Sequence, residues 1–299
     1  MRFAMKDKKS GWVKYEGNPV LGGELGTCFD ISLLNENGRF RMWFSWRPKK
    51  SIALVESVDG IHWNQPIFAL CPNDATDWEK NINRPSVIKK DNEYKMWYTG
   101  QTNERSWLGY ATSQDGVVWK RMSDKPVLSS ELAWEKVAVM CPHVIWDDEM
   151  QLYRMWYSGG EQNEPNEIGY ATSHDGIIWT KYPDNPIFSV DPKNEWEKHK
   201  VTACQVIKLD DEYLMFYIGF GDEEHAQIGV ARSRNGITDW QRHPNNPIIT
   251  PTADQWDSDA TYKPFAMFDG EKWLLWYNGR RGSAEQIGLA IHEGKSLDF

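Results

Sequence analysis

The sequence predicts an all-β protein, a five-bladed β-propeller built of four-stranded antiparallel blades. Three observations support this prediction. Short runs rich in β-branched and aromatic residues are separated by Asn, Asp and Gly turns, as in hairpins. A unit made of such runs recurs five times along the 299 residues. Radial repetition of four-stranded sheets is typical of propellers, so we expect one domain that spans residues 1–299.

The second half of the unit is clearest at 168–179, which reads as a strand, a tight turn and a second strand. Its relatives are the segments 52–63, 108–119 and 228–240. Each turn has the pattern Ser-x-Asp-Gly or Ser-x-Asn-Gly, which resembles the Asp box of propeller hairpins. The acidic residue caps such a turn and the glycine permits a positive φ. We therefore assign Asp59, Asp115 and Asp175 a structural role rather than a catalytic one.

The first half of the unit is a pair of strands such as 84–88 and 94–100. The equivalent first strands begin at residues 30, 84, 141, 203 and 263, so the repeats are 54, 57, 62 and 60 residues apart. Each unit therefore has four strands. The fifth copy of the unit is split. Its third strand, 287–292, has no partner after it, and an orphan fourth strand lies at 11–21. We predict that this N-terminal strand closes the last blade, which would hide two unpaired edges.

The loops that lead into the first strands contain a second repeated pattern. It reads Trp-Glu-Lys at 78–80, 134–136 and 196–198, and Trp-Asp-Ser at 256–258. Four copies in four loops indicate a structural brace rather than a catalytic acid.

Composition excludes several classes of protein. A net charge of −9 and a pI near 5.4 argue against nucleic acid or an anionic membrane as a partner. The four cysteines form no C-x-x-C pair, and we predict no metal and no cofactor. The first nine residues contain no apolar run of the signal-peptide kind, and no stretch of about 20 apolar residues exists. We therefore expect a cytoplasmic protein.

Unlike residues at one repeated position suggest a functional site. The first residue of the five first strands is, in order, Asp30, Arg84, Cys141, Ala203 and Lys263. Two residues further on, where strand side chains point the same way, stand Ser32, Ser86, His143, Gln205 and Phe265. A core built for packing alone would repeat apolar residues here, because buried charge is costly unless it is paired or used. A salt-bridge ring of Asp30, Arg84 and Lys263 that merely closes the channel is the alternative, and a buried core role is the alternative for His143.

Loops expected at the same end of the propeller add aromatic, acidic and basic groups. A funnel lined with such groups suits a polyhydroxylated ligand. The side chains that we assign to substrate binding are Trp46, Arg47, Arg84, Gln101, His143, Gln205, Tyr262, Lys263 and Arg280.

The five-unit Asp-box-like pattern, the x-Pro-x-Val-Ile first strands and the Met-Trp-Tyr second strands resemble the five-bladed glycoside hydrolases, families 43, 32, 62, 68 and 130. The resemblance covers nearly the whole chain. It implies a catalytic carboxylate at the start of the first strand, which Asp30 matches. It also implies an Asp in the second blade and a Glu in the third, where this chain has Arg84 and Met140.

Three functions follow as hypotheses. The first is glycoside hydrolysis at the mouth of the central channel, with Asp30 as acid or base and Glu161 or Asp259 as second carboxylate. The second is phosphorolysis or transfer to an anionic acceptor, as in family 130, with inorganic phosphate bound by cations such as Arg84 and Lys263. The third is a propeller that binds a glycan without cleaving it.

Overall fold

The computed structural model describes residues 10–299. The first nine residues, where the sequence shows no signal-peptide run, lie outside this range. The described residues form two compact units. One contains Asp30–Ser189, and the other contains residues 10–29 together with 190–299. No helix within residues 10–299 is long and apolar enough to cross a membrane.

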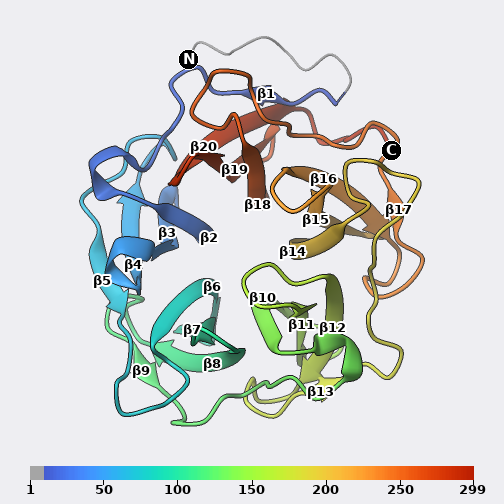
Figure 1. Ribbon diagram of the computed structural model, residues 1–299. Coiled ribbons are helices and arrows are strands. Elements are labelled where there is room, and N and C mark those ends of the chain that lie inside the picture. The colour runs from blue at the N-terminus through green and yellow to red at the C-terminus, as the bar shows by residue number, and fades with distance from the viewer. Residues whose placement is uncertain (1–9) are drawn as a thin grey trace. The chain divides into compact units, whose positions relative to one another are not determined.

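The first unit contains one antiparallel sheet of four strands, sheet I, and one sheet of eight strands whose two antiparallel halves we call sheets II and III (Figure 1). Sheet I consists of β2 (Cys28–Glu36), β3 (Arg39–Trp46), β4 (Ser51–Ser57) and β5 (Ile67–Leu70). Sheet II consists of β6 (Asn81–Lys90), β7 (Glu93–Gln101), β8 (Ser106–Ser113) and β9 (Lys120–Arg121). Sheet III consists of β10 (Ala138–Asp147), β11 (Leu152–Gly160), β12 (Glu167–Ser173) and β13 (Thr180–Lys181). One parallel bridge, Ala138 to Ser106, joins sheets II and III.

The second unit contains sheets IV and V. Sheet IV consists of β14 (Lys200–Lys208), β15 (Tyr213–Phe220), β16 (Ala226–Ser233) and β17 (Gln241–Arg242). Sheet V consists of β18 (Ala260–Phe268), β19 (Lys272–Arg281), β20 (Ala284–Glu293) and the N-terminal β1 (Val13–Lys14). In Figure 1 the blue β1 runs beside the red β20, and Val13 pairs with Ile291. The prediction that the N-terminal strand completes the last sheet is therefore confirmed.

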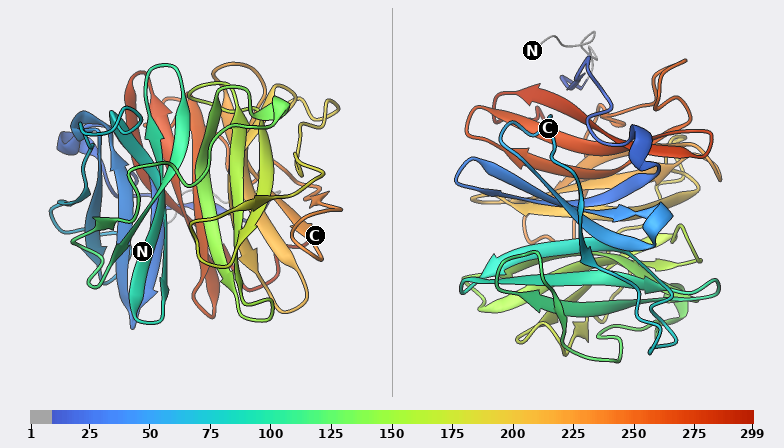
Figure 2. Two further views of the ribbon diagram at one scale, coloured as in Figure 1. Left: turned by 90° about the horizontal axis from the view of Figure 1, so that it is seen from below. Right: turned by 90° about the vertical axis from the view of Figure 1, so that its left-hand side faces the viewer.

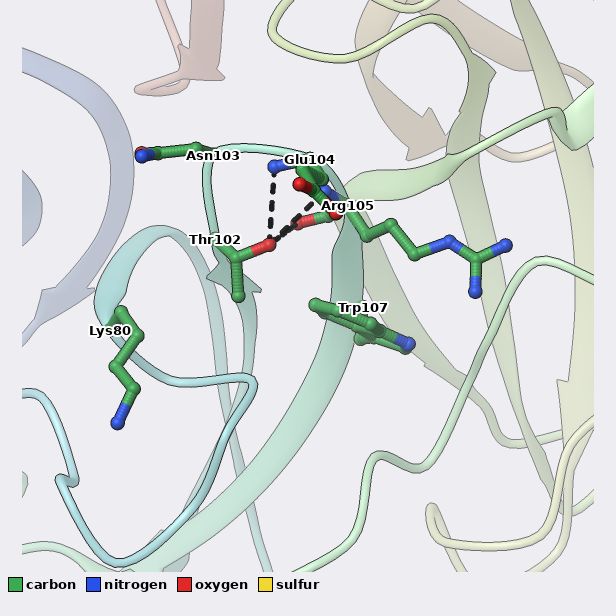
Figure 3. Close-up of a pocket in the computed structure, with 6 residues that line it drawn as sticks. All are labelled: Lys80, Thr102, Asn103, Glu104, Arg105 and Trp107. Atoms are coloured by element: carbon green, nitrogen blue, oxygen red, sulfur yellow. Dashed lines mark hydrogen bonds between the residues drawn. The ribbon is translucent and has the colours of Figure 1, made fainter.

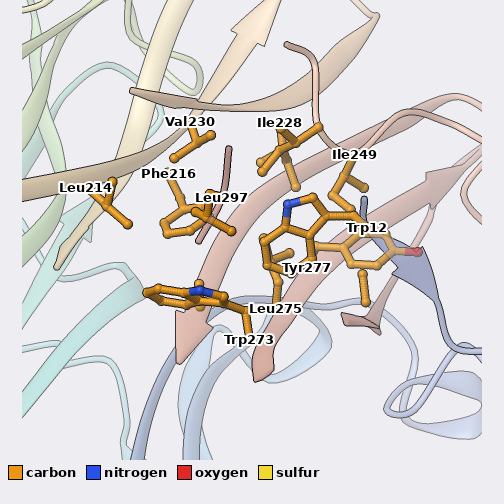
Figure 4. Close-up of a cluster of buried hydrophobic side chains, with 13 residues drawn as sticks. Trp12, Leu214, Phe216, Ile228, Val230, Ile249, Trp273, Leu275, Tyr277 and Leu297 are labelled. Atoms are coloured by element: carbon orange, nitrogen blue, oxygen red, sulfur yellow. The ribbon is translucent and has the colours of Figure 1, made fainter. Parts of the chain in front are cut away.

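Within each sheet the strands lie side by side as an antiparallel ladder (Figure 2). Neighbouring sheets of one unit share a core of large side chains, because alternate residues of each strand point toward the next sheet. Between sheets IV and V, Trp12 meets Phe216 edge to face at 6.2 Å (Figure 4). In the first unit, the indole of Trp43 donates to the carbonyl of Gly116 at 2.9 Å, and Trp97 does the same to Gly176 at 2.8 Å.

The hairpin turns confirm the structural role predicted for their aspartates. Oδ1 of Asp115 accepts hydrogen bonds from the N–H groups of Val117 and Val118, at 2.8 and 2.9 Å. Gly116 has a φ of 73°. Asn235 makes the same two bonds in sheet IV, so the turn needs the oxygen acceptor rather than the negative charge.

The difference in charge between aspartate and asparagine at this turn position predicts that protein stability depends on pH. The N–H groups of Val118 and Val117 hold the pKa of the Asp115 carboxyl below its usual value. The pKa of Asp115 is lower in the folded than in the unfolded protein. The charged carboxylate therefore stabilises the fold above the unfolded pKa of about 3.9, and this stabilisation is lost as the pH falls through the folded pKa. We expect the melting temperature of Asp115→Asn to fall less steeply than that of the wild type below about pH 4. Thermal melts across pH, with the exposed Asp74→Asn as control, would contradict this if all three curves ran parallel.

The loop acids are braces, as predicted. Glu79 is fully buried and accepts from the Tyr98 hydroxyl at 2.7 Å and from Nε of Arg121 at 2.8 Å. The indole of Trp78 covers Gly100 so closely that a Cβ there would lie 2.3 Å from Cε3. The same acid, tyrosine and cation recur in the other sheets that have the loop motif: Glu135, Tyr157 and Lys181; Glu197, Tyr217 and Arg242; Asp257, Tyr277 and Lys14.

Sheet I lacks this brace completely. Phe44 stands at the tyrosine position and Gln65 at the cation position, and the preceding loop has no Trp-Glu-Lys motif. Trp46 replaces the glycine that receives the loop tryptophan in the other sheets. The acid, its donor and its counter-charge are thus present together or absent together, which indicates that they act as one structural group.

Candidate active site

A bulge marks the repeated position at which the sequence places unlike residues. The φ angles there are positive in all five sheets: 51° at Asp30, 55° at Arg84, 54° at Cys141, 35° at Ala203 and 49° at Lys263. The strand register shifts beside this position in sheets II to V. The first strands also begin two or three residues earlier than predicted, at residues 28, 81, 138, 200 and 260. The five positions are therefore structurally equivalent.

Left-handed backbone is unfavourable for residues other than glycine and tends to occur at functional sites. The first unit holds it with bonds between neighbouring sheets. The N–H of Arg84 donates to Oγ of Ser45 at 2.8 Å, and that of Cys141 to Oγ1 of Thr99 at 3.1 Å. The bulge also interrupts the two-residue alternation of side chains. The prediction that the residues two positions further on point the same way depended on that alternation.

Asp30 and Arg84 form a buried ion pair. Nε of Arg84 lies 3.6 Å from Oδ2 of Asp30, and the two residues are 7% and 5% exposed. Burying an ion pair costs desolvation free energy that mutual attraction offsets only partly, so a retained pair calls for a functional explanation as well as a structural one. This contact confirms the Asp30–Arg84 part of the salt-bridge alternative, and it puts a fixed positive charge beside the candidate catalytic carboxylate.

One side-chain amide and one backbone carbonyl hold the guanidinium of Arg84 in place. Nη1 donates to Oδ1 of Asn83 at 2.8 Å, and Nη2 donates to the backbone carbonyl oxygen of Asn163 at 3.1 Å. Gln101 links the two, because its Oε1 accepts from Asn83 at 3.0 Å and its Nε2 donates to Asn163 at 3.2 Å. Gln101, predicted to bind substrate, therefore orients Arg84.

Three of the residues two positions after the bulge form hydrogen bonds between neighbouring sheets. Oγ of Ser32 accepts from the N–H of Val87, and Oγ of Ser86 accepts from that of Val144, both at 2.9 Å. In the second unit, Nε2 of Gln205 donates to the carbonyl of Ala266 at 2.9 Å and its Oε1 accepts from the N–H of the same residue. This bonding gives Gln205 a structural function between sheets IV and V.

The other predicted site residues of the first unit make different contacts. His143 is half-buried on β10, with its ring 6.3 Å from that of Trp156. Trp46 stacks on the exposed Phe68 at 5.6 Å, and Arg47 is exposed at the start of the short 3-10 helix η2 (Arg47–Lys49). Glu161 is exposed after β11, with Oε1 3.1 Å from Nζ of Lys136.

Asp259, the other candidate carboxylate, belongs to the second unit. It accepts from the N–H of Gly282 at 2.7 Å and from Oγ of Ser258 at 2.9 Å. The bond from Gly282, then that from Ser258, with Arg280 and Arg281 nearby, lower the pKa of the Asp259 carboxyl. A general acid must carry its proton at the working pH, so this carboxylate suits a base or a counter-charge better than an acid.

Cations gather in the second unit around the loop between β15 and β16. Nζ of the buried Lys200 lies 3.3 Å from Oε2 of Glu223, and Nε2 of His199 lies 3.1 Å from Oε1. The bond and charge of Lys200, with His199, lower the pKa of Glu223. Arg280 donates to the carbonyl of Glu224 at 2.7 Å. Tyr262 and Lys263 are both buried on β18.

Sequence reasoning missed Asn83, Asn163 and Glu164. Asn163 lies in the loop between β11 and β12 with a φ of 75°, and one carboxylate oxygen of Glu164 beside it is buried. Asn83 could have been found from its place directly before Arg84. The loop residues gave no comparable signal, since only the folded loop brings them to sheet II.

Comparison with known structures identifies the class of protein that this fold defines. A solved structure described as a glycoside hydrolase covers 92% of this chain and 90% of its own, with a TM-score of 0.77 and 18% identity. Another comes from work on the GH130 family of mannoside phosphorylases, which contains glycoside hydrolases that target beta-1,2 mannosidic linkages in Candida mannan. It covers 100% of both chains, with a TM-score of 0.75 and 16% identity. The protein has a glycoside hydrolase fold of the family 43 and 130 kind.

The chain belongs to Glycosyl hydrolases family 43, whose profile matches residues 17–293. Among curated proteins, it is 35% identical over 132 residues to the 1,2-beta-oligomannan phosphorylase of Thermoanaerobacter sp. (strain X514), which covers 41% of this chain and 43% of that protein. The Beta-1,2-mannobiose phosphorylase of the same strain is 27% identical over 139 residues, covering 41% and 44%. The chain thus matches less than half the length of each phosphorylase. The predicted resemblance to families 43 and 130 is confirmed.

Proposed function

We propose that this protein cleaves a β-linked mannoside by phosphorolysis, with Asp30 as its acid. The observation that carries the proposal is the buried Asp30–Arg84 pair at 3.6 Å. Where the family 43 pattern has a second carboxylate, this chain has a guanidinium beside Asp30. Replacing an acid by a cation favours an anionic reactant over an activated water. The two phosphorylases among its relatives support the same reaction.

In this reaction the bond between the anomeric carbon and the glycosidic oxygen breaks. The carboxylate of Asp30 takes the proton of the incoming hydrogen phosphate and gives it to the departing oxygen, while an oxygen of the phosphate bonds to the anomeric carbon. The products are a sugar 1-phosphate and the shortened saccharide, and Asp30 is left charged beside Arg84, as it began. Because phosphate is itself the nucleophile, one protein carboxylate is sufficient, whereas hydrolysis normally uses two.

The cationic residues assigned from the sequence are the proposed phosphate ligands, with Lys263 and Arg280 foremost. The bonds of Arg84 to Asn83 and Asn163 fix its guanidinium beside Asp30, and its proposed task is to attract the phosphate from that position. Tyr262 and His143 are proposed to contact the sugar. Trp46 and Arg47 are proposed to lie at its outer end.

Phosphate dependence tests the proposal directly. We expect turnover of a β-1,2-linked manno-oligosaccharide to rise with added inorganic phosphate and to stop when phosphate is removed. Phosphorus NMR should show a mannose 1-phosphate in equal amount to the shortened saccharide. Release of free mannose at a rate independent of phosphate would reject phosphorolysis.

Hydrolysis is the second candidate, and the depressed pKa of Asp259 favours it because a charged carboxylate can act as a base. Under hydrolysis, Asp259→Asn or Glu161→Gln should reduce turnover by about 100-fold or more, whereas phosphorolysis leaves both variants near wild type. A glycan-binding protein without catalysis would show thermal stabilisation by the saccharide and no product.

Three wider predictions remain proposals. We propose that the five sheets close into a five-bladed ring, that residues 1–299 act as one domain, and that the protein is cytoplasmic. The completion of sheet V by β1 and the membership of family 43 support the ring.

A further inference from the structure

A pocket of about 460 Å³ lies at the loop end of sheet II, within the size range of small-molecule sites. It is lined by Lys80, Thr102, Asn103, Glu104, Arg105 and Trp107. Figure 3 shows Lys80 and Trp107 on opposite sides of it. The residues combine an aromatic face with amide, ammonium, guanidinium and carboxylate groups.

Comparison among the five sheets singles out Trp107. It pairs across the ladder with Gly100. The residues at the matching place in the other four sheets are polar: Ser51, Glu167, Gln227 and Gln286. A tryptophan needed for the fold would be expected in several sheets, as the loop tryptophans are. Trp107 packs in part against the core of sheet II, but it occurs at this place in sheet II alone, and it remains half-exposed beside the pocket.

The pocket wall is ordered by the same loop that holds Arg84. Nε2 of Gln162 donates to the backbone carbonyl of Thr102 at 2.8 Å, and Oε1 of Gln162 accepts from Oγ of Ser106 at 3.0 Å. The next residue, Asn163, bonds Gln101 and Arg84. Thr102 of the pocket directly follows Gln101, and Gln162 directly precedes Asn163. The pocket is therefore connected to the Asp30–Arg84 pair by residues that are neighbours in sequence.

We propose that this pocket is an outer subsite that binds a further sugar ring of an oligosaccharide chain whose scissile bond lies at Asp30. The indole of Trp107 stacks on the C–H face of the ring, and Lys80, Asn103 and Arg105 donate to its hydroxyls. The inference rests on the proposed function for the location of the scissile bond. It adds that the enzyme prefers longer chains.

The test compares Trp107→Ala with the wild type on β-1,2-linked manno-oligosaccharides of two to five residues. We expect the KM for the pentasaccharide to rise about tenfold and that for the disaccharide to stay unchanged. Val118→Ala, a 73%-exposed apolar side chain in the β8–β9 turn of the same sheet, is the matched control and should change neither KM. Equal effects on both substrates, or no effect on either, would overturn the subsite.

Binding measured without turnover separates this inference from the proposed function. Calorimetric titration of the pentasaccharide into wild type, Trp107→Ala and Arg105→Gln needs no reaction. Weaker binding by both variants supports the subsite even if phosphate dependence fails, and unchanged binding rejects it even if phosphorolysis is established. Arg105→Gln, a substitution at an exposed loop position, keeps the test decisive if Trp107→Ala does not fold.

Discussion

Asp30→Asn should lower kcat/KM for an oligosaccharide by about 1,000-fold, within the range of about 10²–10⁴ that general acid catalysis contributes. The asparagine fills the same space but has no proton to give. The buried Arg84 loses its counter-charge, which lowers the free energy of unfolding, but it keeps its bonds to Asn83 and Asn163, so we expect the variant to fold with a lower melting temperature. Initial rates with phosphate present and a melting curve for each protein would check both expectations.

The leaving group distinguishes an acid from a base at Asp30. The leaving group of a dinitrophenyl glycoside is dinitrophenolate, which departs without a proton. Asp30→Asn should therefore cleave this substrate at a rate close to that of the wild type. If the variant loses both substrates equally while remaining folded, Asp30 acts as base or nucleophile. If it keeps full activity on the oligosaccharide, Asp30 has no catalytic role.

Lys181→Met should destabilise the protein by about 3 kcal/mol, because it leaves a buried carboxylate without its counter-charge. Glu135 is fully buried, and Nζ of Lys181 lies 2.8 Å from its Oε2. Burial first, and then the negative charge of Glu135, raise the pKa of the Tyr157 hydroxyl, so that tyrosine stays a neutral donor. Urea unfolding would measure the change in the free energy of unfolding.

A double-mutant cycle identifies the cause of the lost stability. In Lys181→Met with Glu135→Gln the charge is removed together with its partner, so the double variant should be more stable than Lys181→Met alone. Sheet I is a natural precedent, since Phe44 and Gln65 replace the tyrosine and the cation there. Additive losses would show that the two side chains do not act together.

The repeat could be predicted from sequence because strands, turns and braces obey local rules. Asp115 and Gly116 specify a hairpin by turn chemistry alone, and the matching of β1 to sheet V followed from one missing strand. The contact of Asp30 with Arg84 followed from aligning the repeats. The positive φ at both residues did not, because nothing in Asp30 or Arg84 themselves marks a bulge. Asn163 was not predicted because its contact with sheet II depends on the path of a loop.

The pairing of Val13 with Ile291 has a consequence for biosynthesis. The segment that completes sheet V is synthesised long before its partner strand β20. Until then Lys14 cannot neutralise Asp257, and sheet V has an open edge. Contacts so far apart in sequence form slowly, so assembly of this sheet is expected to wait until β20 has been synthesised, and during that time the open edge is exposed to other nascent chains.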